Sequence, residues 1–462
     1  MEKLWEFGGN SLKNIYFMLG ILLLLISIIA FATRRYSISL IGYLFFAFDC
    51  FYLVPKDILG ASGGNYALVY VAVVGILSIK LPYRRKLPIK LYRAVTYMIA
   101  TIALLCLNTI VYYNLGISSV TIYIRDLFYL LSVFIFLKIP SKDIRKVVSW
   151  MFSITIILTI LYIFQALTGS IIFQTNYDDP SNLRPVQLSN FSLYRVQNSP
   201  AWLPVFLIFV YVLKSPMFNS NILSKLILTL GLIVNQSRTW LVSATVSILY
   251  GMSHLKVKKN YLTGIIIVSF VAVVGGELFM NKFIEGDNYG NTVTSQLTSV
   301  TSFNVNTASN NIEDGTFIYR LGWCIERFNG IIDSGEIDKY LFGLGMMTEK
   351  YAEKIYSFHI GNPSQTGGTV QLFTYDTDYG NIIVRYGLIG GIVIVFFIYQ
   401  VFLFFYKRRK TNSICLAITS IFITIPFLSY SSTTFTQMSY YIVIFLFVNI
   451  VLDEGKGDFI RN

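Results

Sequence analysis

Apolar runs of about twenty residues follow one another along most of this chain, and that length lets a helix cross the hydrocarbon core of a bilayer. Hydrophobic residues make up 55% of the sequence and charged residues only 13%, whereas soluble domains carry roughly 25% charge. Inside lipid each such run satisfies its own backbone hydrogen bonds by forming a helix. The pattern predicts an all-α, polytopic integral membrane protein.

About thirteen spans are predicted by this length rule, within a range of about 12 to 14. The first run has no small-residue cleavage pattern behind it, so it is expected to be a retained helix rather than a signal peptide. The predicted spans are 14–33, 36–54, 65–81, 94–113, 117–137, 147–167, 200–213, 222–234, 240–253, 261–280, 380–406, 413–428 and 437–452.

One long polar interval divides these spans. It gives three predicted parts: a helical bundle (1–280), a loop (281–379) and the C-terminal membrane helices (380–462). A loop this long is typical of a functional segment. Two amphipathic helices are expected in it, at Thr316–Ile332 and Met346–Tyr356.

The apolar stripe of the first amphipathic helix is predicted to run through Phe317, Leu321, Ile325 or Cys324, Phe328 and Ile332, with Arg320 and Arg327 beside it.

The net charge of +13 comes largely from short basic runs between spans. Such runs stay in the cytoplasm, and they explain the excess of positive charge without nucleic acid as a partner. They place 168–199, the turn at Ser237 and the loop 281–379 on the outer side. The basic runs are Lys80–Lys90, Lys138–Lys146, Lys256–Lys259 and Lys407–Lys410.

Arg125 and Asp126 lie within a predicted span, roughly 12 Å in from Ile117 at the rise of a helix. Charges at that depth cost about 2.5 to 3.5 kcal/mol, so they are functional candidates. The alternative is a mutually neutralising pair that holds the bundle together. Asp49 lies closer to a span end, where its side chain can reach water.

Several outer-face residues follow in a recognisable order. Arg195 precedes the seventh span, Ser237-Arg238 forms a turn, and Arg320-Leu-Gly-Trp323 leads on to Gly343-Leu-Gly345. Asp376-Thr-Asp378 and then Arg385-Tyr-Gly387-Leu-Ile-Gly390 complete the series. This succession, from Arg195 to Gly390, resembles the O-antigen polymerase and O-antigen ligase superfamily of bacterial envelope enzymes.

The resemblance implies a multi-pass protein of the bacterial cytoplasmic membrane that performs an inverting glycosyl transfer on its outer face. Its substrates would be oligosaccharide repeat units carried on undecaprenyl diphosphate, and its product a capsule, exopolysaccharide or O-antigen. It also implies membrane lipids, a flippase and a chain-length regulator as partners. No cofactor is expected.

The leaving group of such a reaction is a pyrophosphate, and guanidinium groups bind phosphate oxygens as a bidentate fork at any physiological pH. Arg195 and Arg238 are predicted to bind it, with Arg320 as a third. The alternatives are interfacial anchoring for the first two and a solvated helix face for Arg320.

A positioned base must take the proton of the attacking hydroxyl. The ligases have a His just before the closing Gly-x-x-Gly helix, whereas this chain has Asp376 and Asp378 there and its outer His359 earlier. Asp378 is therefore the candidate base and His359 the reserve, and the polymerase branch is favoured. The alternative is that Asp376 and Asp378 cap the start of the next span.

No metal site is predicted. Asp376-Thr-Asp378 spells the Asp-x-Asp of metal-dependent transferases but lacks a nearby His partner. The four cysteines, Cys50, Cys106, Cys324 and Cys415, show neither metal-ligand nor disulfide spacing.

Two other functions stay open at this point. A ligase would transfer finished polymer to a separate acceptor. A flippase or other transporter of lipid-linked oligosaccharides would be expected to show inverted repeats and short loops.

Overall fold

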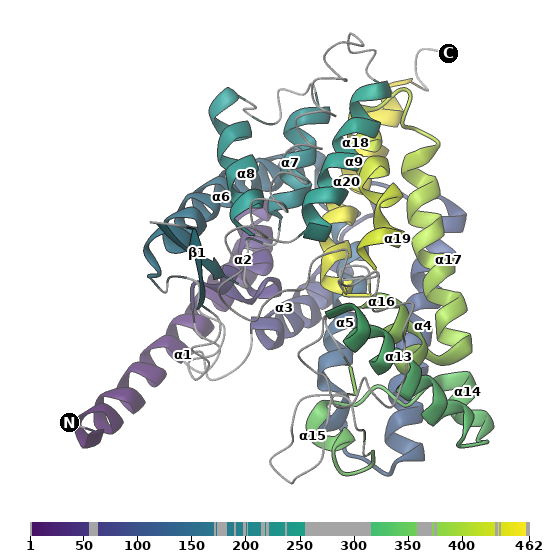
Figure 1. The fold of residues 1–462 in the computed structure, drawn as a ribbon. Coiled ribbons are helices and arrows are strands. Elements are labelled where there is room, and N and C mark those ends of the chain that lie inside the picture. The colour runs from purple at the N-terminus through teal and green to yellow at the C-terminus, as the bar shows by residue number, and fades with distance from the viewer. Residues whose placement is uncertain are drawn as a thin grey trace.

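The computed structural model describes residues 2–54, 63–170, 172, 183–188, 191–196, 200, 202–213, 218, 221–235, 238–254, 316–356, 358, 372–373, 377–429, 433 and 436–458. Over these ranges most residues are helical, and β1 (Leu183–Leu188) pairs with β2 (Phe191–Val196) in a two-stranded hairpin (Figure 1).

Helices lie at each predicted span that the described residues cover, while the predicted span 261–280 lies outside them. They are α1 (Glu2–Ala32), α2 (Tyr36–Ala47), α3 (Gly63–Ser78), α4 (Ile89–Tyr112), α5 (Thr121–Phe136), α6 (Ser141–Thr168), α7 (Leu203–Val212), α8 (Ile222–Val234), α9 (Arg238–His254), α17 (Gly387–Tyr406), α18 (Ser413–Ile423) with α19 (Ile425–Leu428), and α20 (Met438–Asp458).

Four stretches are long and apolar enough to cross a membrane: Ile89–Tyr112, Ile117–Phe136, Ser141–Thr168 and Asp378–Tyr406. Further apolar helices, such as α7 and α18, are shorter. The structure thus supports a helical membrane protein, and the number of spans remains a prediction.

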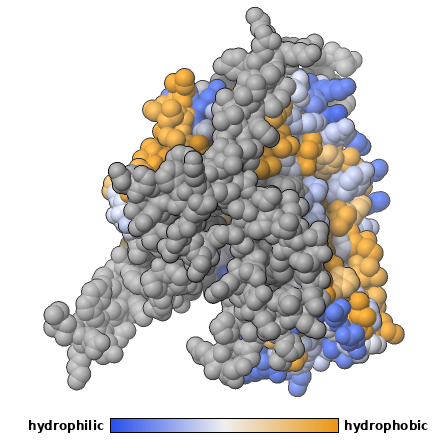
Figure 2. Space-filling model, in the orientation of Figure 1, coloured by the Kyte–Doolittle hydropathy of each residue, from blue (hydrophilic) through white to orange (hydrophobic). Residues whose placement is uncertain are grey.

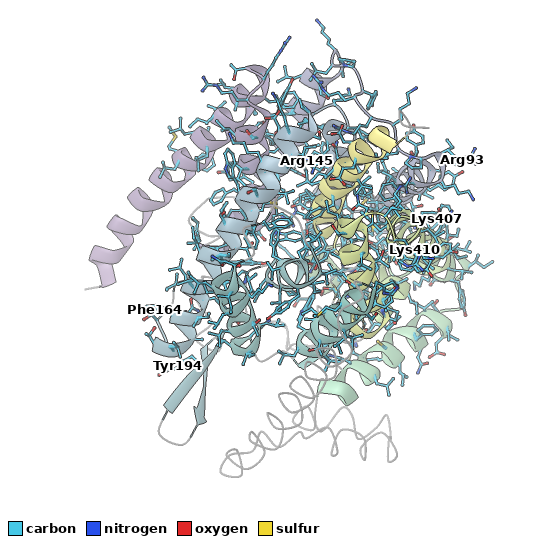
Figure 3. All side chains as sticks on the ribbon, turned by 90° about the horizontal axis from the view of Figure 1, so that it is seen from above. Arg93, Arg145, Phe164, Tyr194, Lys407 and Lys410 are labelled. Atoms are coloured by element: carbon cyan, nitrogen blue, oxygen red, sulfur yellow. The ribbon has the colours of Figure 1, made fainter. Side chains whose placement is uncertain are left out.

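Basic loops from distant parts of the sequence meet at one end of the helices, here called the basic end (79–88, 137–146, 407–412 and 449–454). Arg85, only 5% exposed, donates to Asn449 Oδ1 at 2.6 Å and to Asp453 Oδ1 at 2.8 Å. Lys138 donates to the Ser78 carbonyl at 2.7 Å. Figure 3 looks down on this end, where Arg145 and Lys407 are labelled.

The opposite end, here called the loop end, is formed by the described residues 113–120, 334–356, 358, 429, 433, 436 and 437. Thr348 N donates to the Ser119 carbonyl at 2.9 Å, which fastens the polar interval to the connection between α4 and α5. The helices α4, α5, α17 and α20 each join one end to the other, so the two ends lie on opposite sides of the bundle (Figure 1).

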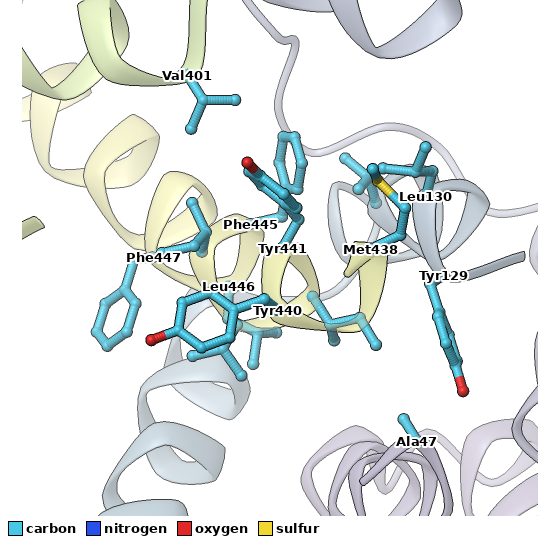
Figure 4. Packing of buried hydrophobic residues seen from close by; sticks show 14 of the residues in the cluster. Ala47, Tyr129, Leu130, Val401, Met438, Tyr440, Tyr441, Phe445, Leu446 and Phe447 are labelled. Carbon is cyan, nitrogen blue, oxygen red and sulfur yellow. The ribbon is translucent and has the colours of Figure 1, made fainter. Parts of the chain in front are cut away.

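The last helix, α20, lies at the centre of the packing (Figure 4). Its Tyr441 ring is 4.7 Å from that of Phe397 on α17, and its Phe447 ring is 4.8 Å from that of Phe209 on α7. Aromatic rings therefore connect α20 to helices that are far apart in the sequence.

Two segments depart from the sequence expectation. The helix predicted at 36–54 ends at Ala47, and Asp49 to Tyr52 follow with φ between 46° and 59°, a left-handed conformation that costs non-glycine residues about 1–2 kcal/mol each. Within 168–199, which was placed on the outer side without any predicted strand, the β1–β2 hairpin packs on the end of α6: a Cβ added to Gly169 would lie 2.8 Å from the Tyr194 ring.

Candidate active site

The first amphipathic helix is present as α13 (Thr316–Ile332), but its buried face differs from the predicted one. Trp323 and Arg327 are fully buried, whereas Phe328 and Ile332 of the predicted apolar stripe are exposed. The Arg327 guanidinium carbon lies 4.8 Å from the Trp323 ring and 4.1 Å from the Phe358 ring. Stacking on aromatic rings lets this arginine replace an apolar residue in the interface.

Arg327 also forms an ion pair with Glu326 at 2.5 Å. Arg320, one turn before Trp323, is half-buried. Of these two α13 arginines, Arg320 is therefore the one that solvent or a ligand can reach.

α13 packs against α16 (Asp378–Asn381), the short helix that leads into α17. A Cβ added to Gly380 would lie 2.6 Å from both the Trp323 ring and the Cys324 sulfur. Only glycine permits this approach. Burial raises the pKa of the Cys324 thiol to about 11.

The two glycine motifs of the polar interval and of α17 are in direct contact. Gly343 follows α14 (Ile337–Phe342) with φ +76°, and Gly387 opens α17 with φ +58°. A Cβ added to Gly387 would lie 2.4 Å from the Gly343 nitrogen, and Leu344 N donates to the Val384 carbonyl at 2.7 Å. The Gly-x-Gly and Gly-x-x-Gly segments thus form one packed turn.

The second amphipathic helix is shorter than predicted: α15 covers Glu349–Ala352. The Glu349 carboxylate accepts hydrogen bonds from the backbone nitrogens of Leu372 and Phe373, at 2.9 and 3.0 Å. Glu349 thereby fixes the position of the Phe373 ring.

Arg385 lies in a π-helical turn, η4 (Ile382–Tyr386), between α16 and α17. Its guanidinium carbon lies 4.1 Å from the Phe373 ring and 5.6 Å from the Tyr123 ring. The side chain is half-buried, and Asp126 on α5 lies within electrostatic range of it. π-helical turns occur frequently at functional sites.

Arg125 and Asp126 are adjacent on α5 and therefore lie about 100° apart around the helix. Arg125 packs on α3, where a Cβ added to Gly64 would lie 2.6 Å from its Nη1. Asp126 is half-buried, and both Arg385 and Arg125 lie within electrostatic range of it.

Asp378 is 1% exposed and lies at the first turn of α16. Its carboxylate accepts from Ser429 Oγ at 3.2 Å and from Thr436 N at 3.1 Å, and its own N donates to the Ser429 carbonyl at 2.8 Å. These bonds fasten α16 to the segment between α19 and α20. They favour an anchoring role, and the role of Asp378 as a base remains a prediction.

The backbones of the two predicted pyrophosphate ligands, Arg195 and Arg238, lie near the C-terminal part of α6. Arg195 follows Tyr194, whose ring packs on Gly169. Arg238 opens α9, three residues after Asn235, which accepts a bond from Tyr162 at 3.4 Å. The side chains of Arg195 and Arg238, and all of Ser237, His359 and Asp376, lie outside the described part of the structure.

Within the residues that the structure describes, no three His, Cys, Asp or Glu side chains gather as a metal site would require.

Comparison with known proteins adds no relative: no family model and no curated protein matches the chain. The family resemblance therefore depends on the motif residues and their order.

Sequence reasoning missed the partners of Arg385. The available signal was an arginine directly before a glycine turn and an apolar run, but Phe373 and Tyr123 belong to other segments. Only the fold brings these three residues together.

Proposed function

We propose that this protein is a membrane glycosyltransferase that polymerises oligosaccharide repeat units carried on undecaprenyl diphosphate, at the outer face of the bacterial cytoplasmic membrane. One observation carries the proposal. The arginine-bearing helix α13, the Gly343 turn and the Gly387 turn, which the family resemblance singles out, form one packed unit at the loop end.

In the proposed reaction, a sugar hydroxyl of one lipid-linked unit attacks the first sugar of the growing chain from the side opposite its diphosphate. A new glycosidic bond forms as the bond to the diphosphate oxygen breaks, and undecaprenyl diphosphate leaves. The hydroxyl proton passes to a base. Such a direct displacement inverts the sugar carbon and needs no carboxylate nucleophile.

Arginines suit this reaction because negative charge develops on the leaving diphosphate, and fixed cations there are often the largest catalytic contribution. Arg195 and Arg238 are proposed for that role, with Arg320 as a third. Asp378 is the proposed base and His359 its reserve.

The test is the product made by purified protein in liposomes that contain lipid-linked repeat units alone. A ladder of polymer lengths is expected, with release of undecaprenyl diphosphate. Transfer only after a separate acceptor is added would indicate a ligase instead. Translocation of a fluorescent lipid-linked oligosaccharide without any new glycosidic bond would indicate a transporter.

A further inference from the structure

Helices α4 and α17 lie side by side and antiparallel, and together they expose an apolar face. The Tyr97 ring lies 6.4 Å from the Phe396 ring, and a Cβ added to Gly390 would lie 3.1 Å from the Leu105 side chain. Figure 2 shows apolar side chains along the right-hand edge, where α17 lies in Figure 1. An apolar face of this kind marks contact with lipid in a membrane protein. This surface, here called the α4–α17 face, includes the exposed side chains of Tyr97, Leu104, Leu107, Ile392, Val395 and Tyr399.

Four cations lie where this face meets the basic end. Lys90 and Arg93 belong to the start of α4, and both are exposed. Lys407 and Lys410 follow the last residue of α17, and both are exposed as well. Because the two helices are antiparallel neighbours, the four residues share one end of the face, and Figure 3 shows Arg93, Lys407 and Lys410 on the same side of the molecule. An anion bound there would meet positive charge from both helices.

No acidic side chain in the described part of the chain pairs with these four cations. The two acids near the end of α20 have other partners: Asp453 pairs with Arg85 at 2.8 Å, and Glu454 pairs with Arg145 at 2.7 Å. The positive charge of the four residues is therefore available to a ligand.

The two arginines within the basic run after α17 are used differently. Arg408 Nη1 donates to the Phe404 carbonyl at 2.9 Å, and Arg409 Nη1 donates to the Tyr406 carbonyl at 2.7 Å. These bonds satisfy carbonyl groups of the last helical turn. The two lysines of the run make no such bond within the described residues, so the lysines rather than the arginines are the candidates for ligand binding.

Two tyrosines lie further along the face, at a depth that suits the glycerol esters of a phospholipid. Tyr97 is one turn beyond Arg93, and Tyr399 is about two turns before Lys407, or roughly 6 and 12 Å inward at the rise of a helix. Their side chains are 51% and 53% exposed. A tyrosine at this level can donate its hydroxyl to an ester carbonyl while its ring packs on an acyl chain. A free phosphate has neither esters nor chains.

We propose that the α4–α17 face binds an anionic phospholipid, with its phosphate among the four cations and its acyl chains along the exposed apolar side chains. Each lysine or arginine beside a span strengthens binding of anionic lipid by about fivefold, so four of them around one headgroup select it over a zwitterionic lipid. The basic end is expected to face the cytoplasm, which would place this lipid in the inner leaflet. The proposal depends on the membrane-spanning fold and not on the proposed function.

The experiment titrates the purified full-length protein in detergent with phosphatidylglycerol, or with phosphatidylethanolamine of the same acyl chains, and native mass spectrometry counts the bound lipid. Wild-type protein is expected to bind phosphatidylglycerol about tenfold or more tightly than phosphatidylethanolamine. Lys407→Gln with Lys410→Gln is expected to remove most of this preference, and Arg93→Gln, on the other helix, to lower it about fivefold. Excess inorganic phosphate is expected not to displace the lipid, because it lacks acyl chains.

The matched control is Lys142→Gln with Lys146→Gln. It removes the same charge from the basic end, and both lysines are exposed, but they lie on α6, which packs against α2, α8 and α20. Figure 3 shows Arg145 of the same segment apart from Lys407. The control is expected to keep the lipid preference of the wild type. Melting temperatures identify any variant that fails to fold, and phosphatidylglycerol is expected to raise them less in the Lys407 and Lys410 variant than in the control.

Equal affinity of the wild-type protein for the two lipids would overturn the proposal, and so would the wild-type preference in both folded test variants. An equal loss of preference in the control would show that the total charge of the basic end sets lipid binding, which would overturn this site. Displacement by inorganic phosphate would overturn the assignment to a lipid. None of these results depends on a polymer ladder, so the proposed function is tested separately.

Discussion

Arg195 and Arg238 are the residues on which the proposed chemistry depends most. Replacing either by alanine is expected to lower polymer formation by about 100-fold or more, the usual effect of removing a group that stabilises developing charge. Arg145→Ala is a suitable control, because this arginine pairs with Glu454 at the basic end. Polymer length and yield on gels, normalised to protein in the membrane, provide the measurement. Full-length polymer from both variants would refute the assignment.

Asp378 can be tested as a base against its anchoring role. If it is the base, Asp378→Asn lowers turnover by about 100-fold or more while binding of the lipid donor changes little. Thr436→Val is the matched variant, because it removes the hydroxyl bound to this carboxylate and keeps the acid itself. Unchanged turnover in Asp378→Asn, together with a lower melting temperature in both variants, would leave Asp378 as an anchor.

Cys324 gives a pH-dependent measure of how tightly α13 is packed. Burial raises the pKa of its thiol to about 11, so the fraction of reactive thiolate rises with pH up to that value. Alkylation is expected to accelerate about tenfold per pH unit between about pH 8 and 10. Labelling followed by mass spectrometry of this peptide measures the rate. A rate that levels off near pH 8.5 would mean that the thiol is exposed.

Among the elements, the contact between the Gly343 and Gly387 turns is the one least able to accept a side chain. A Cβ at Gly387 would lie 2.4 Å from a backbone nitrogen, and its φ is +58°. Gly387→Ala is expected to destabilise the protein by about 2 kcal/mol or more. Gly330→Ala is the control, since apart from its chain neighbours and its own helix backbone no atom lies within 4 Å of its added Cβ. Melting temperatures in detergent compare them, and equal values would contradict the close approach.

Element positions could be predicted well from the sequence, because the length of an apolar run sets where a helix lies in lipid. The buried face of α13 could not be predicted from the sequence. A reading of helical periodicity treats arginine as a polar residue outside the buried face, whereas Arg327 is buried because it stacks on Trp323 and Phe358. The hairpin was also missed, because β1 contains Pro185 and charged residues pair across it, Arg184 opposite Arg195.

The candidate site was predicted in part. Motif order grouped Arg320 with the glycine turns, and α13, α14 and η4 do pack together in the structure, while the roles of these residues stay predictions. Asp126 was singled out by the cost of its charge, but Arg385, which lies within electrostatic range of it, is 259 positions away in the sequence and belongs to another helical segment. Periodicity carries no information on such long-range pairs.

At the scale of the whole molecule, the separation of the basic end from the loop end predicts a fixed orientation in the membrane. Ile337 on α14 is 73% exposed, and Lys410 is exposed at the other end. Ile337→Cys is expected to react with a membrane-impermeant maleimide in right-side-out vesicles, and Lys410→Cys only after the vesicles are opened. Labelling of both cysteines from the same side would refute this topology.

The buried guanidinium group of Arg85 donates a hydrogen bond to Asn449, a residue that the ribosome adds 364 positions later. An uncompensated cation in that place is strongly destabilising. During synthesis, the packing around Arg85 is therefore incomplete until α20 has been inserted. Chains that stop before residue 449 are expected to be recognised as incomplete and degraded.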